Sequence, residues 1–367
     1  MKVMVFGFGE MGRELVDECL EYARNIEIVA LVDNAPKQSR YKDIDIIEPD
    51  SLNKYIYDEI WVSTVYYSEI VKQLVEKFSI NEKIIHFAEP VVPILDEILR
   101  DKYKNELDNL NLVDDEKKEV LTYLKNNKLR MYCYKFYDEY FGKDTEICYD
   151  ASKGLYYGIY NGKHMYLARQ FNTEQKARAY YNAVTMEQDN RCPHCYWNNK
   201  GFANLKGVGI DVGAAEGIFA LKIIEQLDKI YLIEVDERWI EALRYTFEPY
   251  KDKVVIMQKF IGDVDTSINA RLDSLLCNEN INFIKMDIEG MELKALQGAE
   301  QILLQNNVKL AVCVYHNQND NEEITNWLEQ RGYKCSNSRG YVVCQGEWEL
   351  KMMNPNFRRA LLYAEKE

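Results

Sequence analysis

The stretch "GIDVGAAEGIF", residues 209–219, decides the fold of the second half of the chain. It places Asp211 at the end of an apolar run and then brings in Gly213 and Gly217, two glycines four residues apart. An apolar run, a glycine turn and a helical pattern in this order are typical of a strand that passes directly into a helix beside a ligand. The stretch therefore predicts a strand, a ligand-binding turn and a helix.

Apolar runs and helical patterns alternate from residue 207 onward. The helical patterns begin near residues 217, 237, 291 and 321. The expected strands between them are "GVGIDVG", "KIYLIEVD", "KVVIMQKFIGD", "INFIKMDIEG", "KLAVCVYH" and "GYVVCQG". Such alternation predicts an α/β domain with a mainly parallel sheet covered by helices.

A related turn opens the chain in "VFGFGEMGREL", residues 5–15. Gly7, Gly9 and Gly12 separate an apolar run from a helical pattern, and Asp33 ends the next apolar run 21 residues after Gly12. In dinucleotide-binding folds such glycines let a pyrophosphate approach a helix N-terminus, and the acid binds ribose hydroxyls. We expect these four residues to bind NAD(P) or a nucleotide sugar. The alternative is that the glycines only let strand and helix pack closely.

The length of 367 residues exceeds the usual size of one hydrophobic core. We expect an α/β fold of two doubly wound Rossmann-like domains, joined by a helical connector and a small β-hairpin region that turns at Asn161-Gly162. The predicted divisions are a nucleotide-binding type of domain at residues 1–90, the connector at 91–145, the second domain at 146–350 with its core from about 205, and a C-terminal tail at 351–367.

Composition and charge limit the classes of binding partner that the protein can have. A formal net charge of −14 argues against nucleic acid and anionic membranes, which need clustered Lys and Arg. No apolar segment approaches the ~20 residues of a membrane span, and the first apolar run is too short for a signal peptide. Nine cysteines, an odd number, indicate reduced thiols. We expect a cytoplasmic protein that acts on a small-molecule or glycan acceptor without membrane insertion; a homo-oligomer stays open.

Carboxylates distinguish the second glycine turn from a dinucleotide site. Asp211 and Glu216 flank the place where a pyrophosphate would sit and would repel it. They suit S-adenosylmethionine, which carries a sulfonium and an ammonium group. Glu234 closes the next strand 17 residues after Gly217, where it could accept hydrogen bonds from both ribose hydroxyls. The alternative is that Asp211 and Glu234 cap backbone groups or lie in water.

The segments around this turn resemble the FkbM family of S-adenosylmethionine-dependent methyltransferases. The similar segments span roughly residues 205–345 in order and include "DVGAAEGIFAL", "YLIEVDERWIEAL", "ARLDSLL", "FIKMDIEGMELKALQGA" and "LAVCVYHNQND". Upstream, "MEQDNRCPHCY" is similar to a segment of bacterial members that also carry an N-terminal Rossmann-like domain. The resemblance implies O-methylation of a sugar, a polysaccharide or a related product, and it names no acceptor.

The resemblance also implies places for the site residues. Glu234 would lie at the ribose with Val235 beside it, where many members have proline, and Asp263 would lie near the adenine. The other implied contacts are Asp211, Gly213, Ala214 and Gly217 at the methionine end, Asp287 and Glu289 at the mouth of the site, and His194 and Tyr196 against cofactor or acceptor.

Methyl transfer to a hydroxyl needs a group that takes the hydroxyl proton. His316 ends an expected strand, where a doubly wound sheet presents ligand contacts, and an ordinary histidine pKa near ~6.5 suits a base. We expect His316 to be catalytic, the alternative being a structural histidine. Asp287 is the rival catalytic residue, or a ligand of a divalent cation together with Glu289 or Glu292.

The motif Cys192-Pro-His-Cys195 resembles part of a zinc site. With His194 it offers at most three ligands, and no second pair follows at finger-like spacing. We therefore assign no metal.

The favoured function is an S-adenosylmethionine-dependent methyltransferase with an N-terminal nucleotide- or nucleotide-sugar-binding domain. The alternatives are an NAD-dependent oxidoreductase and a sugar-nucleotide-binding protein that use the first glycine turn. An oxidoreductase needs a Tyr-Lys pair or a hydride-facing histidine near that turn, and residues 60–90 show no such arrangement.

Overall fold

The computed structural model describes residues 1–23, 25–64, 67–88, 92–140, 142–199, 202, 204–344, 347–352 and 355–366. The expected domain boundary at residues 90 and 91 lies outside them. The chain divides into two compact units. Unit 1 comprises Met1–Val113, Leu124–Met131 and Cys344–Asn356, and unit 2 comprises Asp114–Tyr123, Tyr132–Val343 and Phe357–Glu367.

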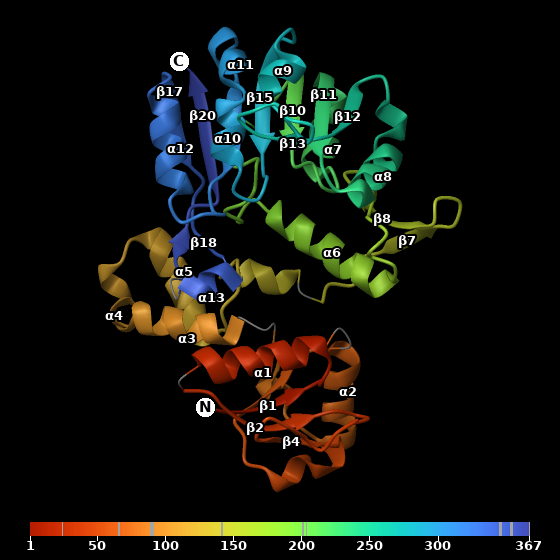
Figure 1. Cartoon of the computed structure of the whole chain (residues 1–367), viewed down its shortest axis with the longest axis vertical. Coiled ribbons are helices and arrows are strands. Elements are labelled where there is room, and N and C mark those ends of the chain that lie inside the picture. Colours follow the sequence, from red (N-terminus) through yellow and green to blue (C-terminus); the bar gives the residue numbers. More distant parts are fainter. Residues whose placement is uncertain are drawn as a thin grey trace. The chain divides into compact units, whose positions relative to one another are not determined.

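Unit 1 contains an open sheet in the order β3-β4-β2-β1-β5-β6 (Figure 1). All neighbouring strands are parallel except β3, which pairs antiparallel with β4. Helix α1 begins directly after Gly9 and buries Gly12, Leu15, Val16 and Cys19, the spacing of one helix face. The elements are β1 Lys2–Phe6, α1 Glu10–Tyr22, β2 Glu27–Val32, β3 Arg40–Tyr41, β4 Ile44–Ile47, β5 Glu59–Val62, α2 Tyr67–Phe78 and β6 Ile85–Phe87.

The expected connector is helical, and its helices belong to both units. Helices α3 (Val92–Lys102) and α4 (Lys104–Asp108) lie in unit 1. Helix α5 (Asp115–Asn126) runs from unit 2 into unit 1, and α13 (Glu347–Met352) brings the chain back to unit 1 near its C-terminus. The chain therefore passes between the units several times.

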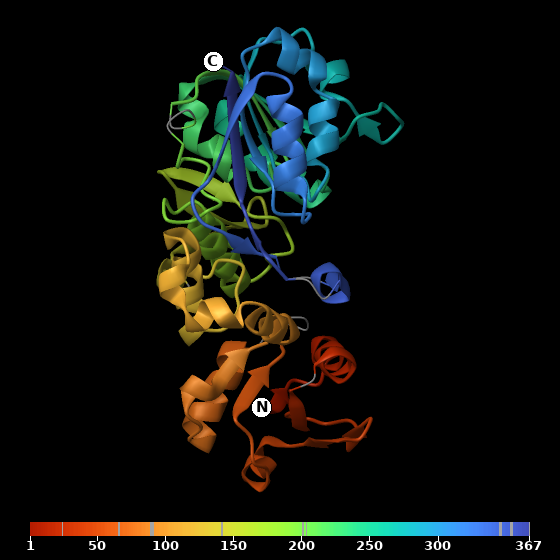
Figure 2. The same ribbon diagram turned by 90° about the vertical axis from the view of Figure 1, so that its left-hand side faces the viewer.

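Unit 2 contains a seven-stranded sheet in the order β12-β11-β10-β15-β16-β20-β17. Strands β12, β11, β10, β15 and β16 are parallel to one another, and β20 is antiparallel to both of its neighbours. Helices lie on both faces of this sheet (Figure 2). The elements are β10 Gly207–Val212, α7 Ile218–Ile223, β11 Leu227–Glu234, α8 Glu237–Thr246, β12 Val254–Gln258, β13 Phe260–Ile261, β14 Asn269–Ala270, α9 Leu272–Leu276, β15 Ile281–Met286, α10 Glu292–Gln297, α11 Glu300–Gln305, β16 Lys309–Cys313 and α12 Asp320–Glu329.

The strand order explains where a ligand can bind. The chain moves from β10 outward through β11 to β12, and then returns to the other side of β10 with β15 and β16. Such a reversal opens a crevice at the carboxyl ends of the two strands where it occurs. In this sheet those strands are β10 and β15. The predicted doubly wound α/β class is confirmed.

The last strands differ from the sequence-based prediction. The expected strand "GYVVCQG" supplies only β18 (Val342–Val343), which pairs with β19 (Phe357–Arg358) outside the main sheet. The main sheet is completed by β17 (Tyr333–Asn337), which was not predicted, and by β20 (Leu361–Lys366) from the expected tail. Strand β17 lies at the sheet edge and carries mostly polar residues, so its pattern lacks the apolar alternation that identifies strands.

The predicted hairpin is confirmed as β8 (Leu155–Tyr160) and β9 (Lys163–Tyr166), with β7 (Ile147–Asp150) on its other side. Asn161 and Gly162 both have positive φ, 49° and 76°, as a two-residue hairpin turn of this kind requires. Helix α6 (Glu174–Glu187) follows.

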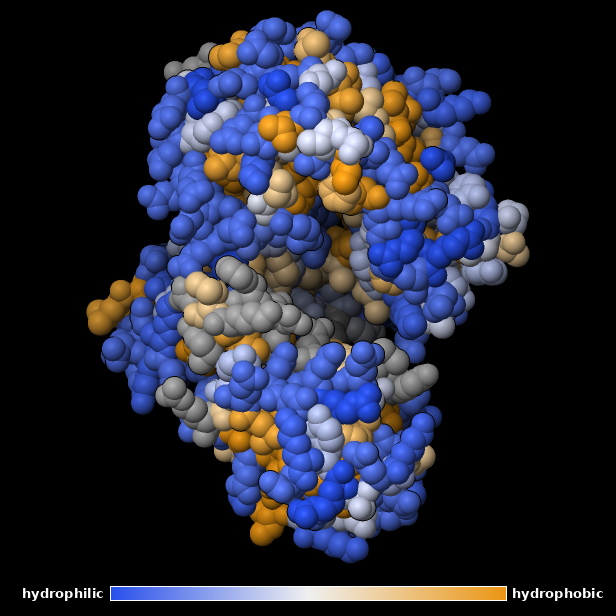
Figure 3. Space-filling view, viewed as in Figure 1, coloured by the Kyte–Doolittle hydropathy of each residue, from blue (hydrophilic) through white to orange (hydrophobic). Residues whose placement is uncertain are grey.

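No helix within the described residues is long and apolar enough to cross a membrane. The face of the molecule in Figure 3 shows mostly hydrophilic residues among scattered hydrophobic ones.

Candidate active site

A cavity lies at the carboxyl ends of β10 and β15. It encloses about 550 Å³, part of which is open to solvent. The lining residues come from α6, from the segment between α6 and β10, from the glycine turn and from the end of β15: Tyr180, Val184, Glu187, Gln188, His194, Tyr196, Gly213, Ala214, Ala215, Glu216, Ile218, Phe219, Lys285 and Asp287.

The glycine turn after β10 is fixed by close backbone contacts. Gly213 has φ +75°, and a Cβ there would lie 1.8 Å from the carbonyl oxygen of Asp287. Gly217 has φ +80°, and a Cβ there would lie 2.6 Å from the Phe247 ring. Only glycine fits either position. The two glycines therefore let the turn pack closely against the Asp287 backbone on one side and Phe247 on the other.

Asp211 is paired inside the protein. Its Oδ1 lies 3.0 Å from Nζ of Lys285, and Lys285 also donates to the Gly213 carbonyl at 2.5 Å. Burial alone would lower the pKa of Lys285, but the Asp211 and Asp287 carboxylates outweigh it and raise this pKa. The sequence analysis did not single out Lys285, although a lysine inside the apolar run "INFIKM" was the signal that could have identified it.

Glu234 organises the turn. Its Oε2 accepts a hydrogen bond from the backbone N–H of Ala215 at 2.9 Å, and Oε1 accepts those of Val235 and Asp236 at 2.7 and 3.0 Å. The carboxylate thus ties the loop after β11 to the loop after β10. Oε1 thus has both lone pairs occupied, and Oε2 keeps one for a ligand hydroxyl.

Glu216 is a buried carboxyl in the cavity wall. Tyr180 donates its hydroxyl to Oε2 of Glu216 at 2.6 Å. Burial raises the pKa of Glu216 to about 7. The charge of this wall therefore changes near neutral pH.

Asp287 is the centre of a polar cluster. Its Oδ2 accepts the Tyr196 hydroxyl at 3.0 Å and lies 3.4 Å from Nε2 of His194. Its Oδ1 lies 3.5 Å from Nε2 of His316 and accepts the hydroxyl of Tyr315 at 3.5 Å. Burial opposes ionisation of Asp287, but the hydrogen bond from His194 and the Lys285 charge hold its pKa far below the usual range. Asp287 is therefore ionised and weakly basic.

His316 is surrounded by carboxylates. Its Nδ1 lies 3.0 Å from Glu292, and its Nε2 lies 3.5 Å from Asp287 and 3.7 Å from Glu289. Burial alone would lower the pKa of His316, but these carboxylates raise it to about 9. At neutral pH the ring is protonated and has no lone pair for a proton. The structure thus gives no support to a general-base role for His316.

The structure brings five of the expected site residues into the cavity lining and leaves the others outside it. Gly213, Ala214, His194, Tyr196 and Asp287 line it. Asp211 pairs with Lys285 of the lining, Glu234 binds the backbone of Ala215 there, and Gly217 ends the turn. Val235 and Asp263 are exposed at the ends of β11 and β13, and His316 lies behind Asp287.

The first glycine turn has structural reasons for its residues. A Cβ at Gly12 would lie 1.9 Å from the Gly7 carbonyl oxygen, and Gly7 has φ +100°. Asp33 accepts hydrogen bonds from the backbone N–H groups of Phe8 at 3.0 Å and Ala35 at 2.9 Å. Asp33 thus already has backbone partners in the turn and in the loop after β2.

The cysteines of the Cys192–Cys195 motif do not join His194. The Cys195 thiol donates to the Gln188 carbonyl at 3.4 Å. His194 contacts instead the thiol of Cys313, with Nε2 and Sγ 3.4 Å apart. Cys313 was not among the expected site residues.

Two family models match parts of the chain. Residues 1–86 match C2185-like, N-terminal, and residues 256–335 match the Methyltransferase FkbM domain. The resemblance to FkbM methyltransferases is thus confirmed for residues 256–335, and the chain carries a methyltransferase domain of this type. No curated protein matches the chain.

Solved structures similar to this chain include several methyltransferases. Methyltransferase FkbM from Methylobacillus flagellatus KT is 16% identical, with 99% of this chain and 89% of that chain covered and a TM-score of 0.48. Precorrin-6y C5,15-methyltransferase from Geobacter metallireducens GS-15 is 16% identical over 44% of this chain and 82% of that chain, with a TM-score of 0.32. TrmK from M. capricolum, solved with S-adenosylhomocysteine, is 8% identical over 44% of this chain and 62% of that chain, with a TM-score of 0.30.

Proposed function

We propose that unit 2 binds S-adenosylmethionine and transfers its methyl group to a hydroxyl of a sugar or polysaccharide-linked acceptor. The observation that carries the proposal is the cavity at the strand-order reversal, which the glycine turn and the carboxyl groups of Glu187, Glu216 and Asp287 line. The methyltransferase match of residues 256–335 supports the same reaction.

The residues present fit this cofactor. The turn after β10 lines the cavity with Gly213, Ala214 and Ala215, which carry no bulky side chain. Glu216 and Asp287 offer negative charge to a sulfonium or an ammonium group. Glu234 holds the two loops together and keeps a lone pair on Oε2 for a ribose hydroxyl.

Bound S-adenosylmethionine supplies an electrophilic methyl group. The chain must then hold an acceptor oxygen in line with it and receive its proton. His194, Tyr196 and Asp287 form the polar wall that can hold such an oxygen. We propose that His316 acts behind this wall as the cationic partner that orients Asp287.

Unit 1 is proposed as a structural domain rather than a nucleotide-binding one. The packing of Gly7 and Gly12 and the hydrogen bonds of Asp33 account for the residues that suggested a dinucleotide. The NAD(P) and nucleotide-sugar interpretations therefore lack a supporting observation in unit 1.

Calorimetry with S-adenosylmethionine and S-adenosylhomocysteine tests the main proposal. The parent chain should bind both, and Glu234→Gln should weaken binding by about 10- to 150-fold, as expected for loss of hydrogen bonds to a charged group at about 1.5–3 kcal/mol. Glu237→Gln, which removes an acid from the nearby start of α8, is the control and should bind normally. No heat of binding with the parent chain would contradict the proposal.

A further inference from the structure

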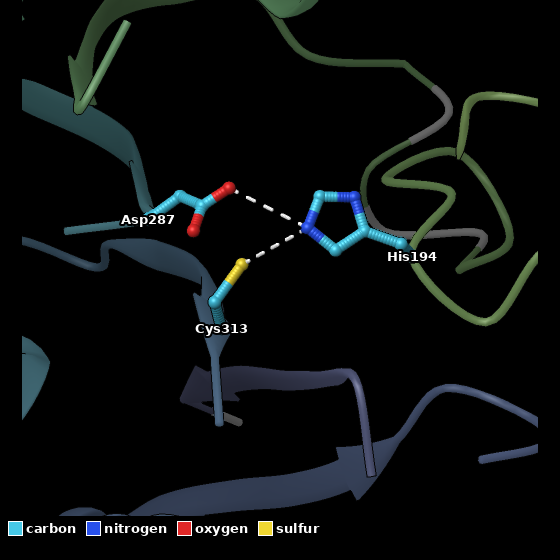
Figure 4. Close-up of side chains that lie close together, drawn as sticks. All are labelled: His194, Asp287 and Cys313. Carbon is cyan, nitrogen blue, oxygen red and sulfur yellow. Dashed lines mark hydrogen bonds and ion pairs between the residues drawn. The ribbon is translucent and has the colours of Figure 1, made fainter. Parts of the chain in front are cut away.

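Three side chains of different chemistry meet at the edge of the cavity. His194 comes from the segment between α6 and β10, Asp287 directly follows β15, and Cys313 ends β16 (Figure 4). Nε2 of His194 lies 3.4 Å from Oδ2 of Asp287 and 3.4 Å from Sγ of Cys313. His194 and Cys313 are buried, and the Asp287 side chain is 21% exposed.

Nε2 of His194 serves two partners at once. Its 3.4 Å separation from Oδ2 of Asp287 is longer than the about 2.7–2.9 Å of a strong charge-assisted hydrogen bond. Its 3.4 Å separation from Sγ of Cys313 is ordinary for a hydrogen bond to sulfur, in which either atom can donate. A single ring nitrogen thus faces two further atoms that are themselves common metal ligands.

The distances fit ligands around a common ion. Zinc lies about 2.0–2.1 Å from nitrogen, 2.0–2.2 Å from oxygen and 2.3 Å from sulfur. At tetrahedral angles these lengths separate nitrogen from oxygen by about 3.4 Å and nitrogen from sulfur by about 3.6 Å. The observed separations are 3.4 Å for both pairs.

We propose that His194, Asp287 and Cys313 bind a thiophilic divalent cation of the zinc type. A thiolate with an imidazole selects such an ion over magnesium or calcium, which prefer oxygen ligands. The thiol proton leaves to solvent when the sulfur binds. The nearby Lys285 ammonium is held by Asp211 at 3.0 Å and by the Gly213 carbonyl, so its charge has partners of its own.

The fourth ligand position has a natural place. His194 and Asp287 line the cavity, so the open side of the three ligands faces it. Three protein ligands and one open position are typical of catalytic zinc. Activation of an acceptor hydroxyl there rests on the proposed function, whereas cation binding itself does not.

A second cluster, of Asp287, Glu292 and His316, needs no cation. Its histidine faces carboxylates at both ring nitrogens. A protonated ring already satisfies these carboxylates. The second cluster also lacks a thiol, which in the first cluster favours a thiophilic cation over magnesium or calcium.

The test uses the full chain carrying Cys277→Ser, which removes an exposed thiol that could bind metal adventitiously. After dialysis against a chelator, Co²⁺ is titrated and thiolate-to-cobalt charge transfer is followed in the near-ultraviolet, and Zn²⁺ is then used to displace it. We expect about one ion per chain and a rise in Tm with Zn²⁺. Cys313→Ser should abolish the thiolate band and His194→Gln should weaken binding at least tenfold. Cys195→Ser is the matched buried control and should keep the band, because a serine there can still donate to Gln188.

Three results would overturn the cation site: no binding by the parent chain, a thiolate band that survives Cys313→Ser, or a band lost in Cys195→Ser alone. If the Cys313 or His194 variants do not fold, the parent chain still tests the cation site through its chelator-reversible Tm shift and its cobalt spectrum. Calorimetry of S-adenosylhomocysteine with the chelated protein separates this question from the proposed function. A chain that binds the cofactor product but no cation contradicts only the cation site.

Discussion

His316→Gln is expected to remove a stabilisation that depends on pH. The ring lies against Asp287, Glu292 and Glu289, and its side chain is only 9% exposed. These carboxylates hold the His316 pKa at about 9, against 6.5 for an ordinary histidine. The folded protein therefore binds this proton more tightly than the unfolded chain does. The resulting stabilisation is fully present below about pH 6.5 and is lost as the pH rises through 9.

The size of the effect follows from the two pKa values. At 1.36 kcal/mol for each pH unit, a rise from 6.5 to about 9 corresponds to about 3 kcal/mol. Urea unfolding of the parent chain and of His316→Gln should thus show a stability difference that shrinks by about 3 kcal/mol between pH 6 and pH 10. Exposed His164, replaced in the same way, is the control and should show little change across this range.

NMR gives the direct measurement. The chain has four histidines, and the resonance missing from His316→Gln identifies the one that should titrate near pH 9. A His316 resonance that titrates near 6.5 would refute the reasoning.

Three further predictions concern the cavity and unit 1. The affinity for S-adenosylmethionine should rise about tenfold from pH 6 to pH 8 as Glu216 ionises at about 7, and Glu216→Gln should remove this rise in calorimetry; an unchanged profile would exclude Glu216 from the cofactor site. Gly213→Ala should destabilise unit 2 by at least about 1 kcal/mol in thermal unfolding, since its Cβ would overlap the Asp287 carbonyl, whereas Gly262→Ala has open space and should be neutral. In unit 1, Gly12→Ala should lower the stability of the fold, because its Cβ would overlap the Gly7 carbonyl oxygen. NAD, NADP and nucleotide sugars should give no thermal shift, and a shift with any of them would restore the nucleotide-binding interpretation.

Local patterns were sufficient to predict most of the sheet in unit 2. Parallel strands buried on both faces give continuous apolar runs, and β10, β11 and β15 were identified from such runs. The glycine turn after β10 was predicted from two glycines that follow an apolar run, and in the structure both have positive φ, 75° at Gly213 and 80° at Gly217. The C-terminal strand β20 was missed because nothing local to residues 361–366 indicates that they insert between β16 and β17.

The partners of the site residues could not be predicted in the same way, because they depend on which side chains meet across the fold. Asp211 was expected to face a cofactor cation. The register of β10 and β15 instead places it opposite Lys285, and the two side chains form an ion pair. The same holds for Asp287, whose position at a strand end was evident but whose neighbours arrive from residues 194, 196, 315 and 316.

These neighbours determine what Asp287 and His316 can do. A histidine at a strand end suggests a base when it is considered alone, since its ordinary pKa lies near neutrality. Three carboxylates around His316 reverse that conclusion, because they keep the ring protonated. The same ring then stabilises the ionised form of Asp287, whose other oxygen faces His194. Residue types at strand ends thus locate the site, whereas the charges that surround each of them decide which proton it holds and which chemistry it can support.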